Sequence, residues 1–241
     1  TDSVFLHLGS GALDIKDVTI SDGFKYSNSG SVWGGCIASL SGTVLLTNSH
    51  VTGCRAATAG SNASASGGAI YAYNVALFDS IVSGSAAASK YSNTIAAGDK
   101  AIIGGSSSPA YGGGILAVNQ LLIFRSLIIG NEASSISSGS YGGGIMAAGS
   151  FTSKYSQISN NEAGTGGGVA VDGTANVTVS YSTISGNEAS FGAGAFLIVA
   201  DAASSVLVEN STISGNTAAL KYGGMIVGGH GSGKKNAKKT P

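Results

Sequence analysis

The chain has 241 residues, 39 of them glycine, and its 12 basic and 12 acidic side chains leave no net charge. Glycine is thus about 16 % of the chain, more than twice its usual ~7 %. No Gly-X-Y period indicates collagen, 43 % apolar residues do not fit disorder, and zero net charge disfavours nucleic-acid binding. No apolar run reaches the ~18 residues of a membrane-spanning helix.

Two short motifs recur along the chain. The first is Gly-Gly-x-Ile, often after an aromatic residue, as at residues 67–70 and 141–145. The second is Ser-x-Ile-Ser-Gly-Asn, clearest at residues 182–187 and 211–216, and its successive copies are 31, 31, 46, 30, 26 and 29 residues apart. A unit of this size cannot bury its own apolar face, so the pattern predicts that neighbouring units stack.

Between the two motifs, apolar residues alternate along the chain. Val44 and Leu46 of one copy correspond to Val75 and Leu77 of the next. A spacing of two is typical of a strand with one buried face, and glycines interrupt every window long enough for a helix. We therefore predict an all-β parallel β-helix of about 7–8 coils, each of ~26–31 residues with three strands, over residues 1–228.

Two segments depart from the repeat. Residues 86–110 lengthen one coil to 46 residues and are expected to form a loop. Residues 229–241, rich in Gly and Lys, are expected to be a flexible tail. Neither end of the solenoid has an evident capping element, so open strand edges would need a partner, a second copy or further chain to cover them.

The paired motifs resemble the right-handed parallel β-helix proteins of the pectin-lyase-like class, and most of all the polymorphic outer membrane protein repeats. Gly67 to Ile70 matches the Gly-Gly-Ala-Ile signature of that family literally, whereas the second motif here reads Ile-Ser-Gly-Asn. The resemblance covers roughly residues 12–228 and implies the right-handed winding. The fold hosts lyases, hydrolases, epimerases, adhesins and structural rods, so it does not by itself imply an activity.

Repeated polar residues are expected to stack from coil to coil. One column comprises Ser49, Ser80, Ser126, Ser156, Ser182 and Ser211. The second comprises Asn131, Asn161, Asn187 and Asn216, whose amides could hydrogen-bond along the axis. Cys36 and Cys54 could form a disulfide or be two small buried residues.

Little in the sequence indicates catalysis. The acidic residues form no Asp-Asp or Asp-x-Asp pair, and His7, His50 and His230 are scattered over different copies. Three stacked carboxylates could bind Ca²⁺ or could line a solvated turn; they are Glu132, Glu162 and Glu188. We assign no catalytic residue, cofactor or metal, and lean towards a protein that is not an enzyme.

The strongest functional indication is an apolar outer face. Alternation after the first motif is expected to point a set of large side chains outward, which we predict to contact a partner. The set is Tyr71, Tyr73, Leu116, Val118, Met146, Phe196 and Ile198. The alternative is that the loop at residues 86–110 covers this face.

Three functions are compatible with these features. The first is a non-enzymatic, extracellular or cell-surface module for structure or adhesion that binds a protein or glycan along its length. The second is a pectin-lyase-like lyase or hydrolase. The third is an ice-binding solenoid, because Thr and Ser recur on one strand, although Ile, Leu, Gln and His interrupt them. Sequons at Asn62, Asn176 and Asn210 are compatible with secretion.

Overall fold

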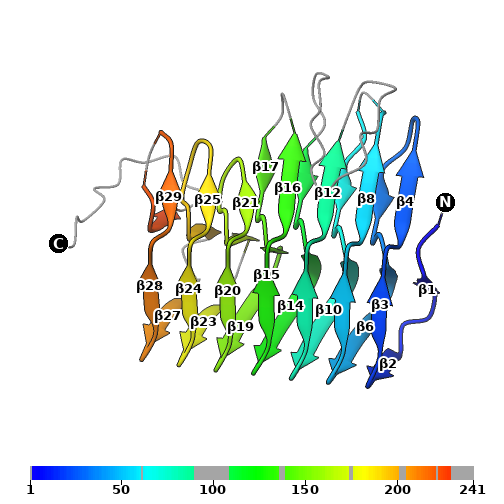
Figure 1. Ribbon diagram of the computed structural model, residues 1–241, viewed down its shortest axis with the longest axis horizontal. Coiled ribbons are helices and arrows are strands. Elements are labelled where there is room, and N and C mark those ends of the chain that lie inside the picture. Colours follow the sequence, from blue (N-terminus) through cyan, green and yellow to red (C-terminus); the bar gives the residue numbers. More distant parts are fainter. Residues whose placement is uncertain are drawn as a thin grey trace.

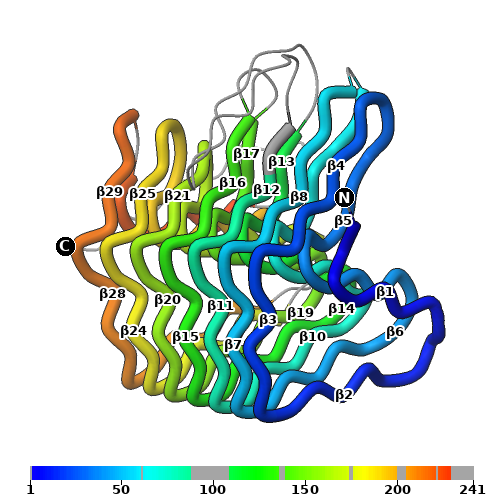
Figure 2. The backbone as a smooth tube through the Cα atoms, turned by 45° about the vertical axis from the view of Figure 1, so that its right-hand side comes forward, coloured from blue at the N-terminus to red at the C-terminus, as the bar shows by residue number. Residues whose placement is uncertain are grey.

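In the computed structural model the chain forms a parallel β-helix, in which successive coils stack along one axis (Figure 1). The structure describes residues 2–60, 62–89, 109–135, 139–173, 176–200, 205–220 and 222–228. These residues form strands and turns, with no helix among them. The predicted all-β fold with about 7–8 coils is confirmed, and each coil follows nearly the same path as its neighbour (Figure 2).

The largest sheet has 12 strands and contains the segment that follows the glycines of each coil. In three coils this segment is one long strand, and a register shift interrupts its pairing between Ala72 and Asn74. In the first coil and in the later coils it is divided in two. The strands are β1 (Phe5–His7), β2 (Ala12–Lys16), β6 (Ile37–Thr47), β10 (Ile70–Phe78), β14 (Ile115–Phe124), β18 (Ile145–Ala147), β19 (Ser150–Lys154), β22 (Val169–Gly173), β23 (Asn176–Ser180), β26 (Phe196–Ala200), β27 (Ser205–Glu209) and β30 (Met225–Gly228).

The second sheet is built from the Ser-x-Ile-Ser motif and has seven strands. They are β3 (Thr19–Ser21), β7 (His50–Thr52), β11 (Ile81–Ser83), β15 (Leu127–Ile129), β20 (Gln157–Ser159), β24 (Thr183–Ser185) and β28 (Thr212–Ser214).

The third sheet also has seven strands, and a fourth has four. The third comprises β4 (Phe24–Ser27), β8 (Arg55–Thr58), β12 (Ala86–Ser89), β16 (Glu132–Ser135), β21 (Glu162–Ala163), β25 (Glu188–Ala189) and β29 (Thr217–Ala218). The fourth comprises β5 (Val32–Trp33), β9 (Ala65–Ser66), β13 (Ala110–Tyr111) and β17 (Ser140–Tyr141).

The division of each coil into strands differs from the prediction. The first two predicted strands lie in one sheet, and the third sheet comes from residues after the second motif, where no strand was predicted. These strands are short and rich in Ala, Ser and Glu, so apolar alternation does not reveal them. The long loop predicted over residues 86–110 is shorter, because residues 86–89 belong to β12 and Ala110 belongs to β13. Residues 90–108 of that loop and the tail at 229–241 lie outside the described residues.

The core consists of apolar columns that run along the axis. Leu46, Leu77 and Ile123 are register partners on adjacent coils, and all three are fully buried. A fully buried side chain of this kind contributes about 1.5–3 kcal/mol relative to an exposed one. These residues pack on their partners in the neighbouring coils, so stacking contributes to the stability of the fold.

Phe196 and Ile198 were predicted to point outward, and this orientation is wrong. Phe196 pairs with Val169 of the previous coil, which places it in the buried column of Ile145, and Ile198 is also fully buried. The prediction aligned Ala195 with the Ile of the first motif, one residue too early. A shift of one residue along a strand exchanges its two faces.

Asparagine side chains form a buried hydrogen-bonded ladder between coils. Oδ1 of Asn161 accepts hydrogen bonds from the backbone N–H and the side-chain amide of Asn131, both at 3.0 Å. Nδ2 of Asn161 donates to Ile128 O at 3.0 Å and to Oδ1 of Asn187 at 2.9 Å. Asn187 repeats these contacts with Asn216, so the ladder asparagines use both their donors and their acceptor.

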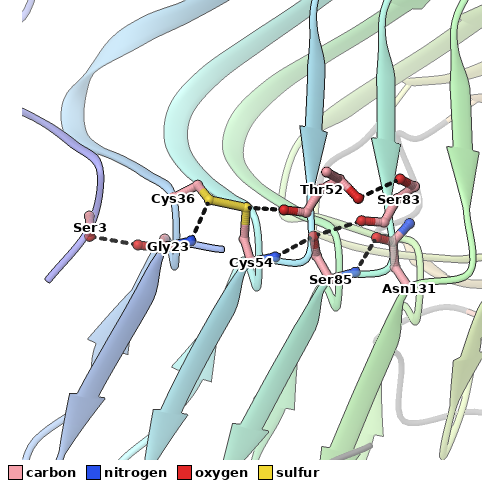
Figure 3. Close-up of a disulfide and its surroundings, with 9 residues drawn as sticks. Ser3, Gly23, Cys36, Thr52, Cys54, Ser83, Ser85 and Asn131 are labelled. Atoms are coloured by element: carbon pink, nitrogen blue, oxygen red, sulfur yellow. Dashed lines mark hydrogen bonds between the residues drawn. A yellow bond between two sulfur atoms is a disulfide. The ribbon is translucent and has the colours of Figure 1, made fainter. Parts of the chain in front are cut away.

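The residue at a ladder position and the residue that faces it across the coil change together along the rod. Gly114, Gly144 and Gly168 lie so close to the ladder amides that an added Cβ would be about 3 Å from the facing Asn Cγ. In the coil that contains β6 and β7, Cys36 occupies the position of the facing glycine and Cys54 occupies the ladder position. The two cysteines form a disulfide (Figure 3). The bridge therefore replaces the Gly–Asn contact of later coils, and Ser85 links Cys54 to Asn131.

Candidate partner-binding surfaces

The first candidate surface is an outer column of the largest sheet, just after the glycine turn. Its members are register partners on successive coils: Tyr71, Leu116, Met146, Ala170 and Leu197. Because strand side chains alternate between faces, these residues point away from the core that the neighbouring Ile column fills. They form an apolar cluster of their own, separate from the core.

Tyrosines of the fourth sheet complete this surface, which we call the tyrosine corner. Tyr111 and Tyr141 pack against the cluster, and their rings stack with centroids 5.8 Å apart. The chain turns the corner between β13 and β14 at Gly112, whose φ of +59° and contact with Ile115 O leave no room for a side chain. Burial raises the pKa of the Tyr71 and Tyr111 hydroxyl groups, so both are uncharged at neutral pH.

The predicted contact residues differ widely in exposure. Leu116 and Met146 face outward but are buried, at 9 % and 8 % exposure. Tyr71 and Val118 are half-buried, and Tyr73 is the most accessible, at 41 % exposure.

The prediction also missed members of the surface. Leu197 points outward, an orientation that the prediction had assigned to its neighbours Phe196 and Ile198 in β26. Tyr111 and Tyr141 could have been found, because each stands at the aromatic position of the first motif.

The second candidate surface runs along the corner between the first and second sheets. Phe78 and Phe124 lie with ring centroids 6.2 Å apart, and Tyr155 packs edge-on against Phe124 at 5.7 Å. Tyr181 stacks on Tyr155 with centroids 5.0 Å apart and planes inclined by 16°. We call these four residues, one per coil, the aromatic edge. Arg125 lies over the Phe124 ring, 4.8 Å from its centroid.

A surface groove of about 260 Å³ continues the same corner towards the N-terminal coils. It is lined by Asp17, Val18, Thr19, Asn48, Ser49, His50, Asp79 and Ile81. Asn48 Nδ2 donates to Asp17 at 2.8 Å, and Arg125 donates two hydrogen bonds of 2.7 Å to the two oxygens of Asp79. The guanidinium of Arg125 holds the pKa of Asp79 below its usual range, which keeps that carboxylate charged.

The remaining candidates for chemistry are distributed along the rod. Glu132, Glu162 and Glu188 are register partners, as their column predicts. Within the described ranges, however, no group of three or more His, Cys, Asp or Glu side chains could hold a metal ion. The imidazoles of His7 and His50 hydrogen-bond to serine hydroxyls.

Comparison with known proteins yields no match to a protein family, a curated protein or a solved structure. The part of the chain that the structure describes holds no helix that could cross a membrane.

Proposed function

We propose that this protein is a non-enzymatic, extracellular or cell-surface β-solenoid module for structure or adhesion, which binds a protein or glycan partner along its outer face. The observation that carries the proposal is the tyrosine corner. Register brings Tyr71, Leu116, Met146 and Leu197 from successive coils into one outward apolar cluster that is separate from the core. Leu116 and Met146 are buried within this cluster, so its accessible part is formed by the half-buried Tyr71, Tyr111, Tyr141 and Leu197. Accessible apolar patches of this kind are typical of an interaction surface.

Two further features support the proposal. Backbone pairing of every coil to the next makes the rod a rigid frame, so a partner would not need to order the surface that it contacts. The Cys36–Cys54 disulfide favours an oxidising environment, such as the cell surface. Right-handed winding and kinship with polymorphic outer membrane protein repeats are part of the same proposal, and rest on the likeness of the motifs.

The test compares wild type with a corner variant, Tyr71→Ser/Tyr111→Ser, on a panel of immobilised polysaccharides and purified extracellular-matrix proteins. Tyr26→Ser is the matched control, because it removes a partly exposed aromatic ring from β4 in the third sheet, outside the tyrosine corner. We expect at least one partner to bind wild type and the control equally, and the corner variant about tenfold more weakly. Equal binding by the corner variant to every partner would contradict the proposal.

A polysaccharide-cleaving enzyme is the second candidate, and the groove beside the aromatic edge is the observation that favours it. Asp17, Asp79 and His50 line the groove, and Arg125 pairs with one of the carboxylates. A general acid needs a raised pKa, whereas Arg125 lowers the pKa of Asp79, so this carboxylate is suited to binding. Release of new reducing ends or unsaturated uronates from a polysaccharide would favour the enzyme.

A further inference from the structure

One column of the solenoid adopts the left-handed backbone conformation in seven successive coils of the described chain. This column turns the corner between the first and second sheets, and φ lies between +46° and +56° at all seven of its residues. Its residues are Asp17, Asn48, Asp79, Arg125, Tyr155, Tyr181 and Asn210. Asp and Asn tolerate this conformation better than other residues with a side chain, and bulky residues tolerate it poorly.

Three consecutive coils therefore carry residues that suit their backbone badly. Arg125, Tyr155 and Tyr181 replace the Asp or Asn of the other coils, although the turn is the same. The two tyrosines gain little burial in return, because their exposed fractions are 53 % and 51 %. Strained residues that remain exposed favour a role in surface chemistry over a role in folding.

The two tyrosine rings leave part of their faces open to solvent. Nearly parallel rings touch at about 3.5–4 Å, so centroids that are 5.0 Å apart require a sideways displacement of roughly 3 Å. Each ring thus offers an uncovered strip of apolar face together with a hydroxyl group. The edge-on contact with Phe124 extends this apolar strip towards the groove.

The polar groups beside the rings include two carboxylates, which accept hydrogen bonds, together with side chains that donate. Asp17 and Asp79 present carboxylate oxygens to the groove, and its other lining residues include Asn48 and Ser49. Arg125 and the exposed Lys154 balance the two carboxylates, so the strip has no excess of either charge. A complementary ligand would be uncharged, would carry many O–H donors, and would present apolar C–H faces to the rings.

We propose that the aromatic edge and the adjoining groove bind a neutral linear polysaccharide that lies along the axis of the rod. Sugar rings stack on Tyr155 and Tyr181, and sugar hydroxyls donate to Asp17 and Asp79. With coils about 4.8 Å apart, the column from Asp17 to Tyr181 spans about 24 Å, which accommodates an oligosaccharide segment. A polyproline-type peptide fits less well, because its backbone lacks the N–H donors that these acceptors require.

This inference rests on the proposed binding function but concerns a different surface from the tyrosine corner. The test is affinity electrophoresis of wild type in gels containing hydroxyethyl cellulose, laminarin, galactomannan or polygalacturonate, with an oligoproline peptide as competitor. We expect at least one neutral polysaccharide to retard wild type. The double variant Tyr155→Asn/Tyr181→Asn should bind it about tenfold more weakly, whereas Tyr26→Ser and the corner variant should bind as wild type does.

The Asn variants suit their turn, so their unfolding midpoint should stay within a few degrees of wild type. An independent readout on wild type is NMR of ¹³C-labelled tyrosine: added polysaccharide should shift the signals of Tyr155 and Tyr181 and leave Tyr73 unchanged. Retardation only by polygalacturonate, displacement by oligoproline, or a double variant that binds normally would overturn the assignment. Neutral-glycan binding lost only in the corner variant would refute the edge site while supporting the proposed function.

Discussion

Replacing one ladder asparagine should show how strongly the coils depend on their buried hydrogen bonds. Asn161→Ala removes a fully buried amide that has four side-chain hydrogen bonds. The backbone N–H of Asn131, one proton of its side-chain amide, and one lone pair each of Ile128 O and Asn187 Oδ1 would lose a partner. Each unsatisfied buried group costs about 1–3 kcal/mol, so we expect the free energy of unfolding to fall by about 3–5 kcal/mol.

The chain supplies matched comparisons for this variant. Asn161→Ser should cost less, about 1–3 kcal/mol, because a hydroxyl can accept from the preceding coil, as Ser85 does from Cys54 N at 3.2 Å. Asn216→Ala should cost only about 1 kcal/mol, because Asn216 is partly exposed and water can replace its partners. Urea unfolding followed by circular dichroism measures all three. A cost for Asn161→Ala no larger than that for Asn216→Ala would refute the reasoning.

Three other features of the rod can be tested by substitution: a closely packed glycine, the disulfide and the Arg125–Asp79 ion pair. Gly144→Ala should lower the free energy of unfolding by about 1–3 kcal/mol, measured by urea unfolding, because its Cβ would lie 2.8 Å from a carbonyl oxygen of the next coil. Cys36→Ala/Cys54→Ala should lower the free energy of unfolding by about 3 kcal/mol, because the disulfide is lost. Cys36→Gly/Cys54→Asn introduces the Gly–Asn contact of later coils and should therefore unfold at a higher urea concentration than the double Ala variant. Arg125 lowers the pKa of Asp79 in the folded state, so the pair stabilises the protein above the unfolded-state pKa of about 3.9 and this contribution is lost as pH falls through the folded-state pKa. The unfolding midpoint of wild type should therefore exceed that of Asp79→Asn at neutral pH and converge with it in acid; a constant difference would contradict the ion-pair assignment.

The repeats made the architecture predictable, because each copy reports independently on the same strand. Apolar columns such as that of Leu46 and Leu77 recur with a spacing of two, and only stacking buries them. The prediction failed where a single copy deviates. Gly192-Ala193-Gly194-Ala195 precedes Phe196, the first residue of β26, and the motif alone does not show which residue occupies the Ile position.

The candidate surfaces were less predictable, because they depend on which side of a corner each turn residue points. The disulfide stayed open at the sequence level, since nothing local shows that Cys36 and Cys54 face each other across one coil. The aromatic edge was missed because Tyr155 and Tyr181 occupy a turn position that Asp or Asn fills in other coils. Only the shared backbone conformation reveals that the tyrosines are the exception.

The most direct test of the account is to incubate wild type with each polysaccharide and matrix protein of the panel, and to measure bound protein and new reducing ends or unsaturated uronates in the same sample. The account predicts reversible, saturable binding to at least one partner, with release of unchanged partner and no product above the level without protein. Product that accumulates with time and with protein concentration would contradict a binding module and identify the protein as an enzyme.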